Sequence, residues 1–312
     1  MPNIEHVTFK HRDMFWEIAA DIYFPPNFDD SRHYPTIVVA HPIGSAKEQT
    51  SGEIYSARLA EQGFVTVAFD ASFQGESGGE PRSIEDPTRR VEDFRHVADY
   101  LVTLPYVDAD RIGLIGMCGG GGYAINTVMT ERRYKAVATI TGANYGRVLR
   151  ETEGSSAAVI EKLEEIAAQR TAEARGADRQ VDMGLPESLE QAAEWGITDV
   201  DLLGATEYYK TPRGAKPNGV NVTLRSHMSP AYGWDAFHLA EGLLTQPLLV
   251  IVGDIPGAFG AYRDGHEIVR RARSEKKELV VIEGWSHYDL YDKDEPVAQA
   301  MAKLTPFFTE NL

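Results

Sequence analysis

The sequence predicts an α/β fold in which a mostly parallel central sheet is flanked by helices. Near-continuous apolar runs at residues 35–40 and 64–70 are typical of parallel strands that are covered on both faces. Segments with helical spacing separate such runs, so strand and helix alternate along most of the chain. The length of 312 residues fits one large domain with a sizeable insertion.

The first elements are expected to be two half-exposed strands, a buried strand, a helix and a second buried strand. Residues 4–9 and 15–23 alternate apolar and polar side chains, as half-exposed antiparallel strands do. Between the two buried runs, residues 51–63 have helical spacing and end at a glycine that suits a helix C-terminus. The next helix is expected to begin with Asp86 as N-cap and Pro87 at the first helical position.

The remaining core elements continue this alternation. A buried-type strand at 111–117 leads into a glycine run and a helix through residues 123–129. The later core elements are strands at 135–141, 246–254 and 277–284 and helices at 265–273 and 296–308.

One interval interrupts the alternation. Between residues 143 and 245, charge-rich helical sequence gives way to a loop-like stretch, and the interval is too long for a connecting loop. We expect a mainly helical cap inserted between two core strands. The chain then divides into a first core part (1–142), the cap insertion (143–245) and a second core part (246–312). The alternative is an accessory or dimerisation element with no role at the site.

Composition excludes several classes of protein. The formal net charge of −16 argues against nucleic acid as a partner, because no excess of Lys and Arg exists to replace counterions. No apolar run approaches the roughly 18 residues of a membrane helix, so we expect no membrane partner. Residues 1–23 mix charged and apolar side chains, so we expect no signal peptide. The single cysteine excludes an internal disulfide, which fits the cytoplasmic location that we expect.

The one cysteine, Cys118, lies between a buried-type strand and a glycine run. Gly116, Cys118 and Gly120 form a G-x-C-x-G pattern, in which a nucleophile occupies a sharp turn from strand to helix and glycines avoid collisions. A helix N-terminus at this turn favours the thiolate over the thiol. The alternative is a small residue packed behind the sheet, with glycines that allow close approach of a helix.

Such a nucleophile needs a base and an acid that follow it in the chain. His287 is the candidate base, because it alone among the nine histidines lies just beyond the last core strand. Asp254 at the end of the preceding strand is the candidate acid, although it follows Gly253 directly instead of two or three residues later. Asp264, a water molecule and a backbone carbonyl are the alternatives. The other interpretations are a surface histidine with satisfied hydrogen bonds at 287 and an aspartate that caps a turn at 254.

Acyl chemistry also needs donors aimed at a developing oxyanion. The first candidate is the backbone N–H of Gly119, directly after the cysteine. The second is that of Ile43, in the loop after the strand at 35–40, because the preceding Pro42 has no N–H. His41 in the same loop is expected to brace the loop rather than to act as a base.

Apolar and aromatic side chains near these positions are candidates for substrate binding. They are Phe73, Met117, Trp285 and Tyr288, together with Tyr208 and Tyr209 of the inserted interval. Residues of these types at such places are as often part of the core, so core packing is the alternative.

Several longer motifs carry a resemblance to a known superfamily. They are "HPIGSAKEQT" (41–50), "AFDASFQGESGG" (68–79), "PRSIEDPTRRVED" (81–93), "TPRG" (211–214) and "HYDLYD" (287–292). Together with the "GMCGGGG" turn they resemble α/β hydrolases of the dienelactone-hydrolase branch with a cysteine nucleophile, close to the polyketide-transferase-like α/β hydrolases. The resemblance covers nearly the whole chain, the inserted interval least. It implies the α/β-hydrolase fold, and it carries over Cys118 and His287, whereas residues 253–260 depart from the usual acid motif.

We therefore expect a hydrolase that cleaves an ester, thioester or lactone of a small acyl substrate. The expected catalytic triad is Cys118, His287 and Asp254, with an acyl-enzyme intermediate. No metal or organic cofactor is implied, because no ligand spacing such as H-E-x-x-H occurs. Two other functions stay open: an acyltransferase that passes the acyl group to a non-water acceptor, and a non-catalytic ligand-binding protein. The sequence does not decide between a monomer and a homodimer.

Overall fold

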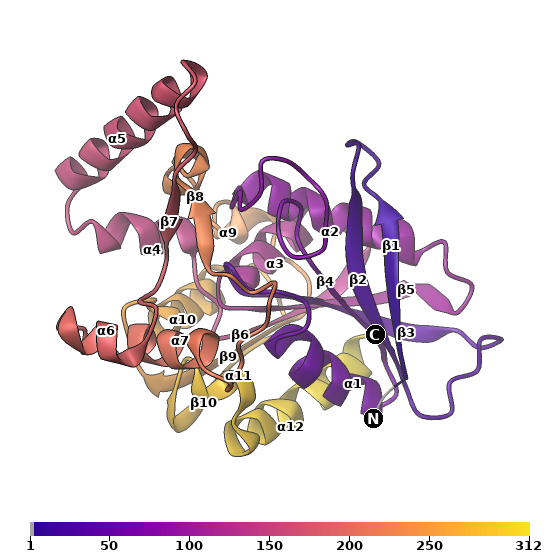
Figure 1. Ribbon diagram of the computed structural model, residues 1–312. Coiled ribbons are helices and arrows are strands. Elements are labelled where there is room, and N and C mark those ends of the chain that lie inside the picture. The colour runs from indigo at the N-terminus through magenta and orange to yellow at the C-terminus, as the bar shows by residue number, and fades with distance from the viewer. Residues whose placement is uncertain (1–2) are drawn as a thin grey trace.

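The computed structural model describes residues 3–312 and is built around one sheet of eight strands (Figure 1). In sheet order, they are β1 (Asn3–Lys10), β2 (Glu17–Phe24), β4 (Val65–Phe69), β3 (Tyr34–Ala40), β5 (Val107–Met117), β6 (Tyr134–Ile140), β9 (Leu248–Ile255) and β10 (Lys277–Ser286). The pairs β1–β2 and β2–β4 are antiparallel, and the other neighbouring pairs are parallel. The predicted mostly parallel sheet is confirmed.

Helices cover both faces of this sheet (Figure 1). One face carries α2 (Pro87–Leu101), α3 (Gly119–Thr130) and α10 (Ala261–Arg271), and the other carries η1 (Thr50–Ser56), α1 (Ala57–Glu61) and α12 (Asp294–Asn311). Val38 and Leu114 pack toward the first face, and Val39 and Ile115 pack toward the second. Both faces of the central strands are therefore apolar, which explains the near-continuous runs. No helix among residues 3–312 is both long and apolar enough to cross a membrane.

The residues between β6 and β9 form the inserted segment (residues 143–245), which adds no strand to the main sheet. Its elements are α4 (Tyr145–Thr152), α5 (Ser156–Ala174), β7 (Val181–Met183), α6 (Leu189–Glu194), α7 (Val200–Lys210), β8 (Val222–Leu224), η2 (Arg225–His227), α8 (Ser229–Tyr232) and α9 (Ala240–Leu243). Figure 1 shows α5 reaching out from the body of the molecule at the upper left. The two short strands β7 and β8 pair only with each other.

Several element boundaries differ from the sequence expectations; β5, for example, begins at Val107 instead of residue 111, and α3 begins at Gly119 instead of residue 123. The second strand begins at Glu17 instead of residue 15, because His11 N–H still donates to the Trp16 carbonyl across the hairpin turn. The helix expected at 51–63 begins with a π-helical stretch, η1. The stretch expected to be loop-like still belongs to α7 as far as Lys210. The predicted start of α2 is confirmed, since the Asp86 carboxylate accepts from N–H groups of the first turn.

Candidate active site

Cys118 occupies the sharp turn between β5 and α3 and is the N-cap of that helix. Its backbone has φ 51° and ψ −127°, a conformation that is costly for a residue with a side chain. The turn requires neighbours without side chains. A Cβ on Gly116 would lie 2.3 Å from the Gly120 carbonyl oxygen, and one on Gly119 would lie 2.5 Å from Cγ1 of Ile43. The G-x-C-x-G pattern thus forms the strand–turn–helix that the sequence predicts.

His287 lies directly after β10, in the turn that leads into α11 (Asp289–Asp292), and is 4% exposed. Its Nε2 is 3.3 Å from the hydroxyl oxygen of Tyr291. The same hydroxyl lies close enough to the Cys118 thiol to lower its pKa. Tyr291 therefore lies beside both the Cys118 thiol and the His287 ring. The sequence reasoning missed this tyrosine, although a helical turn places the fourth residue after His287 beside it.

Burial is the largest influence on the pKa values of the Cys118 thiol and the His287 imidazole. It raises the pKa of the Cys118 thiol to about 11, and hydrogen bonds with Tyr291 and the Gly119 N–H offset only part of that rise. The N–H of Gly119 at the helix N-terminus favours the thiolate, as expected, but burial outweighs this effect. Burial also lowers the pKa of His287 to about 3. The resting pair is a neutral thiol and a neutral imidazole.

The predicted oxyanion donors lie beside the cysteine. The Ile43 N–H has no backbone acceptor among the described residues. The Gly119 N–H lies close enough to the Cys118 sulfur to lower the pKa of the thiol. All three residues line one cavity, so both N–H groups are available to a carbonyl oxygen bound next to the sulfur.

His41 braces the loop after β3 that contains Ile43, as expected. Its Nδ1 hydrogen-bonds the Pro42 carbonyl at 2.7 Å, and its Nε2 accepts from the Ala71 N–H at 3.1 Å. The Arg90 guanidinium donates to the His41 carbonyl at 2.8 Å. Burial, with the Arg90 charge nearby, holds the pKa of His41 well below its usual range. Because both ring nitrogens are engaged in the loop, His41 is not available as a catalytic base.

A cavity of about 370 Å³ is lined by Cys118 and by residues of both the core and the inserted segment. Tyr209 of α7 lies in its wall, whereas Tyr208 packs behind it with its ring 5.1 Å from that of Tyr291. Apolar and aromatic side chains dominate the contribution of the inserted segment. They include Tyr145, Leu149, Ile166, Leu185, Leu202 and Tyr232.

Of the four residues first expected to bind substrate, Tyr288 lies in the wall of this cavity and the other three do not. Met117 is fully buried on the α12 side of the sheet, because successive strand residues point to opposite faces. Trp285 packs on the same side, with the Lys293 ammonium 5.7 Å from the centre of its ring. Phe73 lines a separate cavity of about 220 Å³. The expectation is therefore corrected for Phe73, Met117 and Trp285.

Asp254 does not orient His287 in this structure, contrary to expectation. Its side chain is exposed, and its Oδ1 accepts from the Gly284 N–H at 2.6 Å. Asp254 still belongs to β9, and the backbone beside that strand holds its carboxylate. Asp264, the alternative, forms a buried ion pair with Arg147 at 2.6 Å. The Nδ1 atom of His287 is buried without a hydrogen-bond partner among the described residues.

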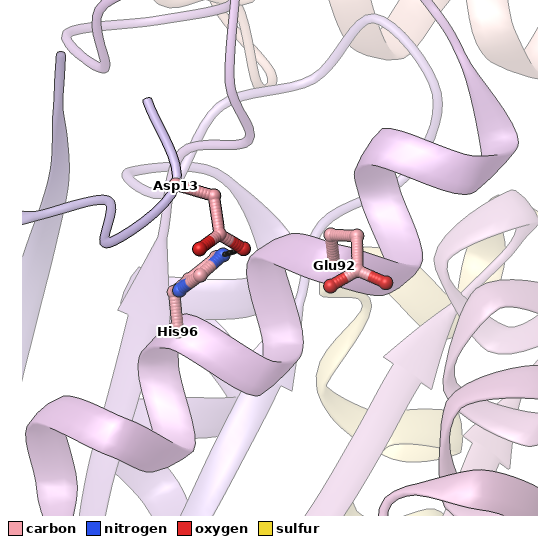
Figure 2. Close-up of side chains that lie close together, drawn as sticks. All are labelled: Asp13, Glu92 and His96. Atoms are coloured by element: carbon pink, nitrogen blue, oxygen red, sulfur yellow. Dashed lines mark ion pairs between the residues drawn. The ribbon is translucent and has the colours of Figure 1, made fainter. Parts of the chain in front are cut away.

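Two groups of acidic and histidine side chains in the described part of the chain lie close enough to share a cation. Figure 2 shows the first, in which Asp13 faces His96 while Glu92 lies one turn earlier on the same helix. The Asp13 carboxylate is 3.5 Å from Nε2 of His96, and Glu92 forms a close ion pair with Arg95. None of these residues lines the Cys118 cavity.

The second group, formed by Glu48, Asp70 and Glu76, surrounds the ammonium of Lys47. Lys47 Nζ is 2.6 Å from a Glu76 oxygen and 3.6 Å from an Asp70 oxygen. The Lys47 side chain is itself buried. A lysine thus supplies the cation of this cluster, which braces the loop after β3.

Comparisons with known proteins agree with this fold. The sequence model of the dienelactone hydrolase family matches residues 19–194. The chain is 42% identical to the uncharacterized protein YcjY of Escherichia coli, over 95% of this chain and 94% of that protein. It is 35% identical to the uncharacterized protein PA2218 of Pseudomonas aeruginosa, over 99% of this chain and 81% of that protein.

The fold comparison gives the same picture. The crystal structure of PA2218 superposes with a TM-score of 0.89 and 32% identity, covering 100% of this chain and 94% of that one. The α/β-hydrolase fold expected from the sequence is confirmed.

A more distant sequence relative is the thiohydrolase aneE of Aspergillus aculeatus. It is 28% identical over 34% of this chain and 33% of its own length.

Proposed function

The chain belongs to the dienelactone hydrolase family, and on this premise we propose that it is a cysteine hydrolase of small esters, thioesters or lactones. One observation carries the proposal: Cys118 on its strained turn lines the same cavity as the two oxyanion donors, Ile43 and Gly119. His287 reaches the thiol through the hydroxyl of Tyr291. This arrangement matches the needs of nucleophilic acyl chemistry, which are a nucleophile, a base and donors for an oxyanion.

The acylation half of the reaction begins at the thiol. Its proton passes to Nε2 of His287 by way of the Tyr291 hydroxyl while Sγ of Cys118 forms a bond to the carbonyl carbon. The N–H groups of Ile43 and Gly119 hold the oxyanion, and a donor of this kind contributes roughly 3 kcal/mol. The bond to the leaving alcohol or thiol then breaks, and that group takes the proton from His287.

Deacylation runs the same steps with water. A water molecule gives a proton to His287, and its oxygen attacks the acyl carbon. The bond between sulfur and carbon breaks, the free acid leaves, and the sulfur regains its proton. No proton or electron is gained or lost by the enzyme over the cycle.

The inserted segment is proposed to act as a cap that encloses the acyl group. At ~30 Å³ for each water-sized group, the cavity of about 370 Å³ holds roughly a dozen heavy atoms. Its wall is mostly aromatic and aliphatic and also includes Glu153, Lys162 and Asp182, so it suits an acyl group with an apolar body. The name of the thiohydrolase relative aneE supports thioesters as one substrate class.

Replacing the nucleophile tests the proposal. Cys118→Ala should abolish turnover of p-nitrophenyl acetate and of a short acyl thioester, while circular dichroism and Tm report an intact fold. Cys118→Ser should retain little activity, because a serine hydroxyl is far less acidic than a thiol. Hydrolysis by Cys118→Ala at the wild-type rate would refute the proposal.

A further inference from the structure

In the described part of the core, no carboxylate at or just after the end of β9, where the acid of a triad is expected, is bonded to His287. Asp254 binds the Gly284 backbone, and the next two residues of the loop, Ile255 and Pro256, have no acidic group. Helix α7 of the inserted segment places Asp201 there instead. A Cβ on Gly257 would lie 2.2 Å from Cγ of Asp201. The cap carboxylate therefore fills the space that a side chain of the β9–α10 loop would occupy.

Asp201 and His287 each keep one buried polar atom without a partner. Oδ2 of Asp201 accepts from the Phe259 N–H at 2.9 Å, whereas its Oδ1 is buried and has no hydrogen-bond partner among the described residues. Nδ1 of His287 is buried and unpartnered in the same way. Buried polar atoms are almost always paired, so an unpartnered acceptor and an unpartnered ring nitrogen in one region call for an explanation.

One residue, Phe259, lies against both partners, and a second contact joins α7 to Tyr288, the residue after His287. Phe259 donates its N–H to Asp201, and its ring packs edge-on against the His287 ring at 5.8 Å between centroids. Gly204, three residues after Asp201 on α7, is packed so closely that a Cβ there would lie 3.0 Å from Cβ of Tyr288. The face of α7 that carries Asp201 is therefore turned toward the 287–288 segment.

We propose that Asp201 is the positioning carboxylate of His287, supplied by the cap, and that it accepts the Nδ1 proton once substrate is bound. The inference rests on the proposed function, because it assigns a partner to the proposed base. Catalytic hydrogen bonds are often long in an empty site and shorten in the substrate complex. The catalytic apparatus is then complete only when the cap lies on the core.

Burial, rather than a charged partner, sets the protonation of both groups in this structure. Burial lowers the pKa of His287 to about 3 and raises the pKa of Asp201 to about 6, with the Phe259 N–H acting in the opposite direction on Asp201. Each group lacks the opposite charge that would favour its ionised form. A carboxylate at Nδ1 raises the pKa of the imidazolium, so the thiol proton can be transferred to His287 during attack.

The test uses Asp201→Asn in the full-length enzyme, which keeps an acceptor for the Phe259 N–H but removes the charge. We expect kcat/KM for p-nitrophenyl acetate to fall by roughly 10²- to 10⁴-fold. The acidic limb of the pH profile should move to lower pH, because the imidazolium loses the carboxylate that raises its pKa. Gly257→Ala, which displaces the carboxylate without changing any charge, should lower kcat/KM in the same direction.

Asp254→Asn is the matched variant, since it removes the carboxylate that binds Gly284. It should move the acidic limb less than Asp201→Asn does, and the reverse order would overturn the proposal. Activity of Asp201→Asn within twofold of wild type would also overturn it, as would a loss with an unmoved acidic limb, which marks a structural role. Failure of the proposed hydrolase itself is distinguishable, because it would appear as undiminished activity of Cys118→Ala.

Discussion

Replacing Tyr291 with phenylalanine removes one oxygen atom from the site and leaves the ring packing in place. That oxygen is 3.3 Å from Nε2 of His287 and lies close enough to the Cys118 thiol to lower its pKa, in a residue that is fully buried. A hydrogen bond to a group that becomes charged contributes about 1.5–3 kcal/mol. At about 1.4 kcal/mol for each factor of ten, Tyr291→Phe should lower kcat/KM by roughly 10- to 150-fold.

Two assays check this value. The first is steady-state hydrolysis of p-nitrophenyl acetate, and the second is the rate of iodoacetamide alkylation of Cys118 against pH. The alkylation profile should move to higher pH, because the lost hydrogen bond lowers the pKa of the thiol in the wild type. Tyr208→Phe is the matched control, since this buried ring packs against Tyr291 outside the cavity wall. Equal activity in Tyr291→Phe and wild type would refute the reasoning, as would an equal loss in both variants.

Two further predictions concern stability. Gly116→Ala would place a Cβ 2.3 Å from the Gly120 carbonyl oxygen. We therefore expect the free energy of unfolding, measured in urea, to fall by roughly 1–3 kcal/mol. An unchanged free energy of unfolding would contradict the close approach at this turn. The pKa of His287 in the folded protein, about 3, lies below the ordinary value of 6.5. As pH falls, the unfolded state therefore takes up the proton first, and the free energy of unfolding decreases between pH 6.5 and about 3. His287→Gln should flatten the dependence of Tm on pH in this window, and a variant with the wild-type slope would show that another group causes it.

The elbow could be predicted from the sequence because its causes are local. Cys118 needs a strand before it, a helix after it and glycines at 116 and 120, and all of these are visible within ten residues. The position of His287 at the same edge of the sheet as Cys118 could be predicted because it follows the last core strand, and parallel strands bring their carboxyl ends to one edge. The fold class followed from the same periodic patterns.

The rest of the site depends on tertiary packing that no local pattern encodes. Met117 is next to Cys118 in the chain, yet strand alternation turns its side chain to the opposite face. Asp201 lies in a helical insertion that contacts the core through Asp201 with Phe259 and through Gly204 with Tyr288. The three-residue strands β7 and β8 are also too short to produce a pattern.

The central claim is that the single thiol performs the chemistry, and its alkylation tests that claim most directly. The measurement is intact mass and residual esterase activity of the wild type at increasing times with iodoacetamide, repeated across pH. The account predicts one adduct on Cys118, a loss of activity that follows the adduct one for one, and a rate that climbs with pH because burial raises the pKa of the thiol to about 11. Full activity of the alkylated protein would contradict the account. A thiol that stays unmodified in the folded, active enzyme would contradict it as well.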